Sequence, residues 1–244
     1  MTWKAIGESV PGTSHIAADK GCDDAVRFIA EGGRLIACIS DGAGSALYGA
    51  QAARYCADNM VSLLSALNTC SETAVYQSVE KIYDGLVTLA AAHECELNEW
   101  SCTLLGCYAD GDMAIYFQVG DGAIVCREAD GTYHHIWWPH NGEYQNVTAF
   151  VVDNPGLADL NVRTVNGCPE EIAMFTDGLQ MLALNYEQQQ PHQPFFTALF
   201  PSLRMADTVE RQTMLSQRLA AYLDSQAINE RTDDDKTLFL ATRL

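Results

Sequence analysis

The residues of this sequence best suited to chemistry are aspartates that directly follow short apolar runs. The same Asp-Gly pair ends three such runs: Asp41-Gly42, Asp121-Gly122 and Asp177-Gly178. A strand that ends in this pair places a carboxylate and exposed backbone carbonyls at the edge of a sheet, where glycine lets the chain turn sharply. Hard divalent cations bind oxygen donors of this kind. For any single pair, an ordinary turn with a capping aspartate explains the pattern equally well.

Two further acidic groups lie at predicted strand boundaries. Asp23 and Asp24 precede a strand at 26–29, and the run 233–235 precedes the last strand, at 237–242. Five acidic sites that converge at one end of a sheet would repel one another unless cations neutralised them. Two divalent ions that share one aspartate would do so and would also activate a water molecule for hydrolysis. Taken together, the five sites predict a binuclear metal centre.

The elements that would position these residues are strands in two groups and three helices. Apolar alternation predicts strands at 26–29, 34–40, 102–109, 112–119, 123–128 and 132–138, then shorter ones at 147–152, 162–165, 171–176 and 237–242. Asp110-Gly111 and Asp130-Gly131 predict hairpin turns, so residues 102–138 are expected to form a consecutive antiparallel meander. Apolar stripes predict helices from near Gly49, after the N-cap Ser71, and over 208–223. The segments 139–144 and 188–201 are predicted as surface loops.

Grouped helices and antiparallel strands favour an α+β fold. We expect a β-sandwich of two antiparallel sheets packed face to face, flanked by helices in α/β/β/α layers. The chain shows no linker and no change in composition along its length. Residues 1–244 are therefore predicted to form a single domain.

The amino-acid composition indicates which partners the protein can bind and in which compartment it works. The net charge is −18, from 14 basic and 32 acidic residues, which disfavours binding to nucleic acid or to an anionic membrane. No apolar run is long enough to span a bilayer, and we see no secretory signal. The nine cysteines include no CxxC pair. We therefore expect reduced thiols in a cytoplasmic protein.

Read in order, the motifs resemble those of one known family, the metal-dependent protein phosphatases of the 2C type, in their bacterial serine/threonine branch. The resemblance spans nearly the whole chain, from Gly12 to Leu240, with Thr103 matching a further threonine motif. The matching motifs are Cys22-Asp23-Asp24-Ala25, Ser40-Asp41-Gly42-Ala43-Gly44, Val119-Gly120-Asp121, Thr176-Asp177-Gly178-Leu179 and Asp234-Asp235-Lys236-Thr237.

The resemblance implies two Mn²⁺ or Mg²⁺ ions and a third, weaker site. Asp41 would bridge the two ions and the Gly42 carbonyl would bind one of them, while Asp177 and Asp234 would hold the other. Asp24, with Asp23 beside it, would serve the second ion, and Asp121 the third. Asp24 and Asp41 are thus the expected catalytic residues. A hydroxide that bridges the ions would attack the phosphorus of phosphoserine or phosphothreonine in a protein, which implies a serine/threonine kinase or its targets as partners.

Two positions depart from the pattern of the family. Many relatives carry a histidine after Asp-Gly to protonate the leaving group, where this chain has Ala43. Relatives also often carry an arginine shortly before the acidic pair, where this chain offers only Lys20, a point charge rather than a bidentate fork. His15 and Lys20 are therefore the predicted substrate-binding residues. A surface or capping role explains His15 about equally well.

Two other functions are consistent with parts of the sequence. The missing histidine and arginine are compatible with a weak or inactive phosphatase fold that binds a phosphoprotein or kinase and regulates it. The five intact acidic motifs argue against this, because a buried carboxylate without a partner is costly. A calcium-binding module is disfavoured, because the aspartates are dispersed and form no EF-hand loop.

Overall fold

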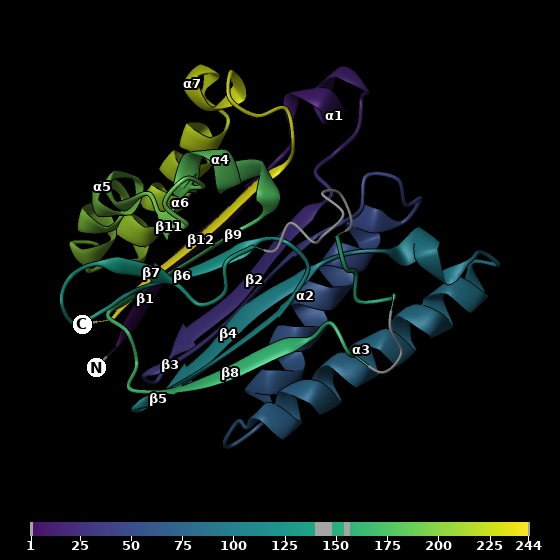
Figure 1. Cartoon of the computed structure of the whole chain (residues 1–244), viewed down its shortest axis with the longest axis horizontal. Helices are drawn as coiled ribbons and strands as arrows, with labels where there is room; N and C mark the ends of the chain where they lie inside the picture. The colour runs from purple at the N-terminus through teal and green to yellow at the C-terminus, as the bar shows by residue number, and fades with distance from the viewer. Residues whose placement is uncertain (1, 140–147, 154–156, 244) are drawn as a thin grey trace.

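Two five-stranded antiparallel sheets lie face to face between two layers of helices (Figure 1). The computed structural model describes residues 2–139, 148–153 and 157–243. In the first sheet the order is β2 (Asp24–Glu31), β3 (Arg34–Asp41), β4 (Leu104–Asp110), β5 (Met113–Val119) and β8 (Asn161–Asn166). In the second it is β1 (Trp3–Val10), β12 (Lys236–Arg243), β9 (Glu171–Phe175), β6 (Ala123–Arg127) and β7 (Tyr133–His135). A short ribbon joins β10 (Leu184–Asn185) to β11 (Gln190–Pro191).

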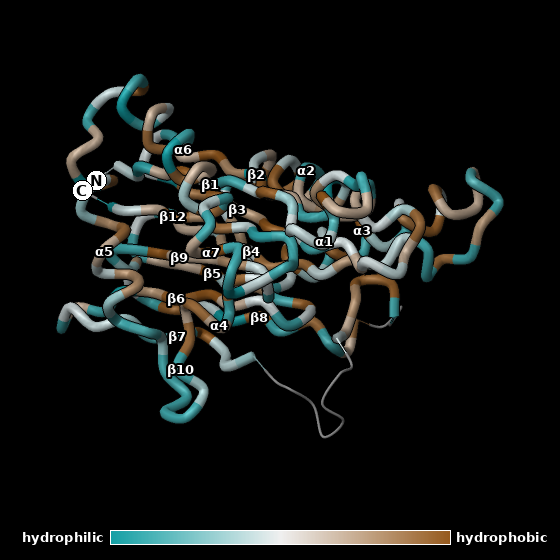
Figure 2. The backbone as a smooth tube through the Cα atoms, turned by 90° about the horizontal axis from the view of Figure 1, so that it is seen from above, coloured by the Kyte–Doolittle hydropathy of each residue, from teal (hydrophilic) through white to brown (hydrophobic). Residues whose placement is uncertain are grey.

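The inner faces of the two sheets share one apolar core. Ile39 and Tyr116 of the first sheet belong to the same buried cluster as Ile124, Met174 and Phe239 of the second. Figure 2 shows the apolar strand segments gathered in the middle of the molecule and the polar segments in its peripheral turns. The sandwich is thus held by burial of side chains that alternate along each strand. The predicted α+β sandwich is confirmed.

Each sheet is covered on its outer face by a pair of long helices. α2 (Gly49–Ser65) and α3 (Glu72–Ala92) pack on the first sheet, and α5 (Gln193–Arg204) and α6 (Val209–Leu223) on the second. Ser71 is the predicted N-cap of α3, and its side chain accepts a hydrogen bond from the Ala74 amide at 3.2 Å. The described residues also form three shorter α-helices: α1 (Thr13–Ala17), α4 (Gln180–Ala183) and α7 (Gln226–Asn229).

The predicted meander is wrong at one point that matters for the site. β4–β5 and β6–β7 are hairpins as expected, but β5 and β6 belong to different sheets. The segment Gly120-Asp121-Gly122 carries the chain from one sheet to the other. Alternation of apolar residues is the same whether the next strand joins the current sheet or the facing one, so the pattern could not reveal the crossing.

Other elements also differ from the sequence-based expectation. β1 was not predicted, although it pairs with β12 along its whole length. The segment predicted as a loop at 188–201 contains most of α5, whose Phe196, Phe200 and Leu203 are buried at helical spacing; its two prolines concealed this pattern. Of the predicted strand at 147–152, residue 147 lies outside the described residues, 148–150 lack regular structure and 151–153 form a turn. Of the predicted loop at 139–144, only residue 139 is described.

No helix in the described part of the chain is both long and apolar enough to cross a membrane.

Candidate active site

The strand ends at one end of the sandwich bring the acidic residues together. Asp24 begins β2 and Asp41 ends β3, and the register places the two opposite each other. Asp177 follows β9 and Asp234 precedes β12, which pair with each other, while Asp121 lies in the crossing between β5 and β6. Antiparallel pairing alternates chain direction, so these starts and ends meet at the same edge.

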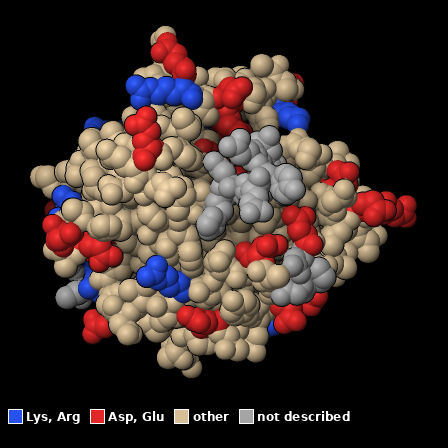
Figure 3. Space-filling view, in the orientation of Figure 1, with Lys and Arg blue, Asp and Glu red and all other residues tan. Residues whose placement is uncertain are grey.

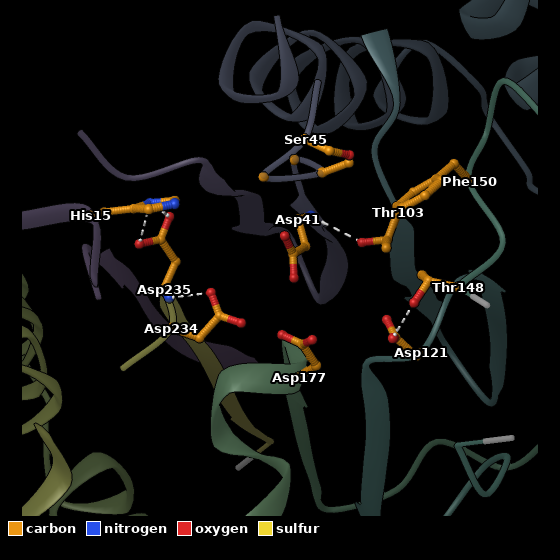
Figure 4. Close-up of a pocket in the computed structure, with 13 residues that line it drawn as sticks. His15, Asp41, Ser45, Thr103, Asp121, Thr148, Phe150, Asp177, Asp234 and Asp235 are labelled. Carbon is orange, nitrogen blue, oxygen red and sulfur yellow. Dashed lines mark hydrogen bonds and ion pairs between the residues drawn. The ribbon is translucent and has the colours of Figure 1, made fainter. Parts of the chain in front are cut away.

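Most of these side chains surround a pocket of about 250 Å³. In Figure 4 the carboxylate of Asp41 lies near the centre, with Asp177, Asp234 and Asp121 around it. Asp24 does not line the pocket but lies buried beside Asp41 in the sheet. The lining residues are His15, Asp41, Gly42, Ala43, Gly44, Ser45, Thr103, Asp121, Thr148, Phe150, Asp177, Asp234 and Asp235.

Burial and mutual repulsion raise the pKa values of the central carboxyls. Burial, followed by the charges of Asp24 and Asp177, raises the pKa of Asp41 well above its usual range. Burial is also the main cause that raises the pKa of Asp24 to about 8. The pKa of Asp177 is raised to about 6 by burial and then by the charges of Asp121 and Asp234. The carboxyl groups of Asp24, Asp41 and Asp177 thus repel one another when they are ionised. A bound cation would neutralise this repulsion.

Two buried carboxylate oxygens, Oδ1 of Asp24 and Oδ1 of Asp177, have no hydrogen-bond partner within the described ranges of the chain. Buried polar oxygens without partners are rare in folded proteins and call for an explanation such as an ion. The nearby atoms that could bind a metal ion are carboxylate and carbonyl oxygens, which are suitable ligands for Mg²⁺ and Mn²⁺. The residues present thus fit the divalent cations that the sequence predicts.

Close backbone packing fixes the loops that carry two of the aspartates. A Cβ atom at Gly42 would lie 2.3 Å from the carbonyl carbon of Gly49, and one at Gly178 would lie 2.0 Å from the carbonyl oxygen of Asp235. Only glycine permits approaches this short. The Asp-Gly pairs that the sequence singled out therefore hold the adjacent carboxylates of Asp41 and Asp177 in place.

Threonine hydroxyls form hydrogen bonds with three of the aspartates. Thr176 Oγ1 donates to Asp24 Oδ2 at 2.7 Å, and Thr148 Oγ1 donates to Asp121 Oδ2 at 2.6 Å. Thr103 Oγ1 accepts a hydrogen bond from the Asp41 amide at 2.9 Å. Thr103 was noted in the sequence through the family resemblance, and Thr176 lay within a quoted motif without an assigned role. Thr148 carried no signal, because it lies far from Asp121 along the chain.

The segment between β1 and β2 contributes one residue to the described wall of the pocket. Of the two predicted substrate-binding residues, His15, on α1, lines the pocket, whereas Lys20 is exposed and is not among the described lining residues. Asp235 accepts hydrogen bonds from this segment, and ligand atoms of His15, Asp23 and Asp235 lie within 4.8 Å of one another. Ala43 lines the pocket without offering a polar side chain.

The family model for protein phosphatase 2C matches residues 11–224 of the chain. The protein therefore belongs to the protein phosphatase 2C family, as its motifs predicted. It is 35% identical to Serine/threonine-protein phosphatase 3 of Escherichia coli (strain K12) over 254 aligned residues, which cover 99% of this chain and 98% of the relative.

Solved structures of phosphatases share the fold. The S. agalactiae serine/threonine phosphatase superimposes with a TM-score of 0.69 at 14% identity, covering 99% of this chain and all of that one. The catalytic domain of the serine threonine protein phosphatase PstP, in complex with two manganese ions, gives a TM-score of 0.66 at 12% identity, covering 99% of this chain and 98% of that one.

Proposed function

We propose that this protein is a serine/threonine protein phosphatase that requires Mn²⁺ or Mg²⁺. The observation that carries the proposal is the convergence of Asp41, Asp121, Asp177 and Asp234 on one pocket, where Oδ1 of Asp177 is buried and has no hydrogen-bond partner among the residues that the structure describes. Membership of the protein phosphatase 2C family supports the reaction. The similarity to Serine/threonine-protein phosphatase 3 of Escherichia coli supports phosphoserine and phosphothreonine as substrates.

The family resemblance implies the proposed ligands, and all of them except Asp24 and its neighbour Asp23 line the pocket. Asp41 would serve both ions, the Gly42 carbonyl one of them, and Asp177 and Asp234 the other. Asp24, with Asp23 beside it, would serve the second ion, and Asp121 would serve a third, weaker one. When bound, the ions would neutralise the carboxylates, polarise the phosphoryl group and activate the attacking water. Asp24 and Asp41 are the proposed catalytic residues.

The shape and charge of the pocket also bear on substrate binding. About 250 Å³ is enough for a phosphorylated side chain but not for a folded segment of its protein, which would have to remain at the rim. Without cations the aspartates would repel a phosphate dianion. Asp and Glu also outnumber Lys and Arg on the face shown in Figure 3. His15 on the pocket wall is the proposed contact to the phosphoryl group, and Lys20 at the exposed end of the same segment remains a predicted one.

The alternative, a regulator with the same fold but little or no turnover, has one observation in its favour: Ala43 brings no proton donor to the pocket. It is the weaker interpretation, because every side chain that is predicted to bind a cation is acidic and most of these side chains surround one pocket. Loss of catalysis removes the reason to keep buried carboxylates that repel one another.

We further propose that the substrates are proteins phosphorylated by a serine/threonine kinase, and that the protein works in the cytoplasm. The nine cysteines, all free thiols, support a reducing compartment.

The experiment is hydrolysis of p-nitrophenyl phosphate and of a phosphothreonine peptide by the purified protein, with EDTA, Mg²⁺ or Mn²⁺ added in turn. We expect release of phosphate only with a divalent cation, and we expect excess EDTA to abolish this activity. A folded protein that hydrolyses neither substrate with any cation would favour the regulatory alternative.

A further inference from the structure

Asp235 contacts three hydrogen-bond donors, all from the segment between β1 and β2. Its side chain is 4% exposed and accepts hydrogen bonds from the Gly12 amide at 2.6 Å and from the Asp23 amide at 2.5 Å. Its carboxylate also lies 3.0 Å from Nδ1 of His15 (Figure 4). The buried carboxylate of Asp235 thus contacts both ends of the segment formed by residues 12–23. It also contacts His15, the side chain by which this segment lines the pocket.

Only an acceptor-only side chain satisfies this arrangement. One oxygen of Asp235 faces the Gly12 amide and the other faces the Asp23 amide, so both sides of the group meet N–H donors. An asparagine would turn its NH₂ toward one of these amides and leave a buried donor without a partner. The carboxylate also fixes the imidazole: Nδ1 of His15 must carry the hydrogen, because a carboxylate has none to give.

The orientation of His15 leaves Nε2 free of Asp235. Nε2 is 3.8 Å from Oδ2 of Asp23, too far for a hydrogen bond, and the residue lines the pocket. Ser14 also holds the segment of residues 12–23 against residues 233–235. Its amide and its Oγ donate hydrogen bonds to the Asp233 carbonyl at 3.0 and 2.7 Å. A Cβ at Gly12 would lie 2.2 Å from the same carbonyl oxygen.

Asp235 is also part of the group His15, Asp23 and Asp235, whose ligand atoms lie close enough together to share a cation. However, both oxygens of Asp235 already accept hydrogen bonds from backbone amides. A cation at Asp235 would have to compete with these contacts for the lone pairs of the two oxygens. Asp235 therefore differs from Asp177, whose Oδ1 has no donor in the described structure.

We propose that Asp235 is a positioning residue that orients His15, so that Nε2 of His15 contacts the phosphoryl group of the substrate in the pocket where position 43 is an alanine. This inference rests on the proposed phosphatase function and adds to it the atom that meets the substrate and the residue that aims it. His15 touches the substrate, and Asp235 acts through His15.

The test compares kcat and KM of the wild type with those of matched variants at His15. His15→Asn retains a nitrogen near the position of Nδ1 and can still donate to Asp235, but it lacks the outer ring atom. His15→Gln can place an amide nitrogen near Nε2. We expect His15→Asn and His15→Ala to lose about 10- to 100-fold in kcat/KM, and His15→Gln to recover part of that loss. A wild-type kcat/KM in His15→Asn would overturn the contact between His15 and substrate.

The role of Asp235 is tested by a double-mutant cycle. Asp235→Asn should lower kcat/KM in the wild type but add little in a His15→Ala background, because the two residues act as one unit. The affinity of the Asp235→Asn variant for Mn²⁺, measured by calorimetry, should stay within about threefold of the wild-type affinity. Disturbing the surroundings of a metal site typically lowers its affinity 10- to 100-fold. Equal losses with and without His15, or Mn²⁺ binding as weak as in Asp41→Asn, would overturn the proposal.

A spectroscopic measurement needs no substitution and no turnover. The ¹⁵N resonances of His15 in the Mg²⁺-loaded wild type should show a hydrogen on Nδ1, and a ring without it would overturn the role of Asp235. If the wild type is folded but inactive with every cation, the proposed function fails while this result still decides whether Asp235 orients His15. Should Asp235→Asn not fold, the His15 variants and the ¹⁵N spectrum remain decisive.

Discussion

The pocket has two unlike sides. On one side Asp41, Asp177 and Asp234 stand at or beside the ends of paired strands, and the register of two sheets fixes where they lie. On the other side His15 belongs to a segment that joins two strands, and hydrogen bonds to residues 233–235 hold that segment in place. A carboxylate on a strand end moves only if the sheet moves, whereas the segment can undock locally. The two sides should therefore respond differently to substitution.

The same difference explains how much could be predicted from the sequence. Asp41 and Asp177 were found because apolar runs that end in Asp-Gly mark strand ends, and strand ends share an edge. The grouping of strands and helices also predicted the sandwich, and the order of the motifs predicted the family. The prediction that residues 1–244 form a single domain stays a prediction.

The other side of the pocket could not be predicted in the same way. The role of Asp235 depends on contacts between residues more than 200 positions apart, and no local pattern encodes them. Within the run 233–235, composition alone does not tell a side chain that faces the pocket from one whose oxygens face backbone amides. The crossing at Asp121 was missed for a related reason, because strand alternation does not say which sheet comes next.

The largest expected effect lies on the strand-end side. Asp41→Asn should lower cation-dependent hydrolysis by about 1,000-fold or more, because several kcal/mol of transition-state stabilisation depend on the ions it would hold. Asp58→Asn is the matched control, since Asp58 is exposed and, among the described residues, forms an ion pair only with Arg27. Initial rates with saturating Mn²⁺ check both variants, and full activity in a folded Asp41→Asn protein would remove Asp41 from the reaction.

A smaller effect is expected on the side of the segment. A Cβ at Gly12 would collide with backbone atoms of Asp233 and Asp234, whereas one at Gly21 would meet nothing within 4 Å. Gly12→Ala should therefore undock the segment and lower kcat/KM roughly tenfold, with a change of less than about 2 kcal/mol in the free energy of unfolding. Gly21→Ala should match the wild type in kcat/KM and in the free energy of unfolding.

Kinetics, urea unfolding and limited proteolysis of residues 12–23 measure this difference. If Gly12→Ala lost as much global stability as a core substitution, the segment would be an integral part of the sandwich. The proposed contrast between the two sides of the pocket would then fail.

The central claim, that the strand-end aspartates form a cation site, is tested most directly by calorimetric titration of Mn²⁺ into EDTA-treated protein at pH 7.5 and 5.5. Because the pKa of Asp177 is raised to about 6 and that of Asp24 to about 8, protons compete with the cation more strongly at the lower pH. We expect binding at pH 7.5 that weakens at pH 5.5, releases protons, and is lost in Asp41→Asn and Asp177→Asn. No binding at pH 7.5, or binding that both variants retain, would contradict the account.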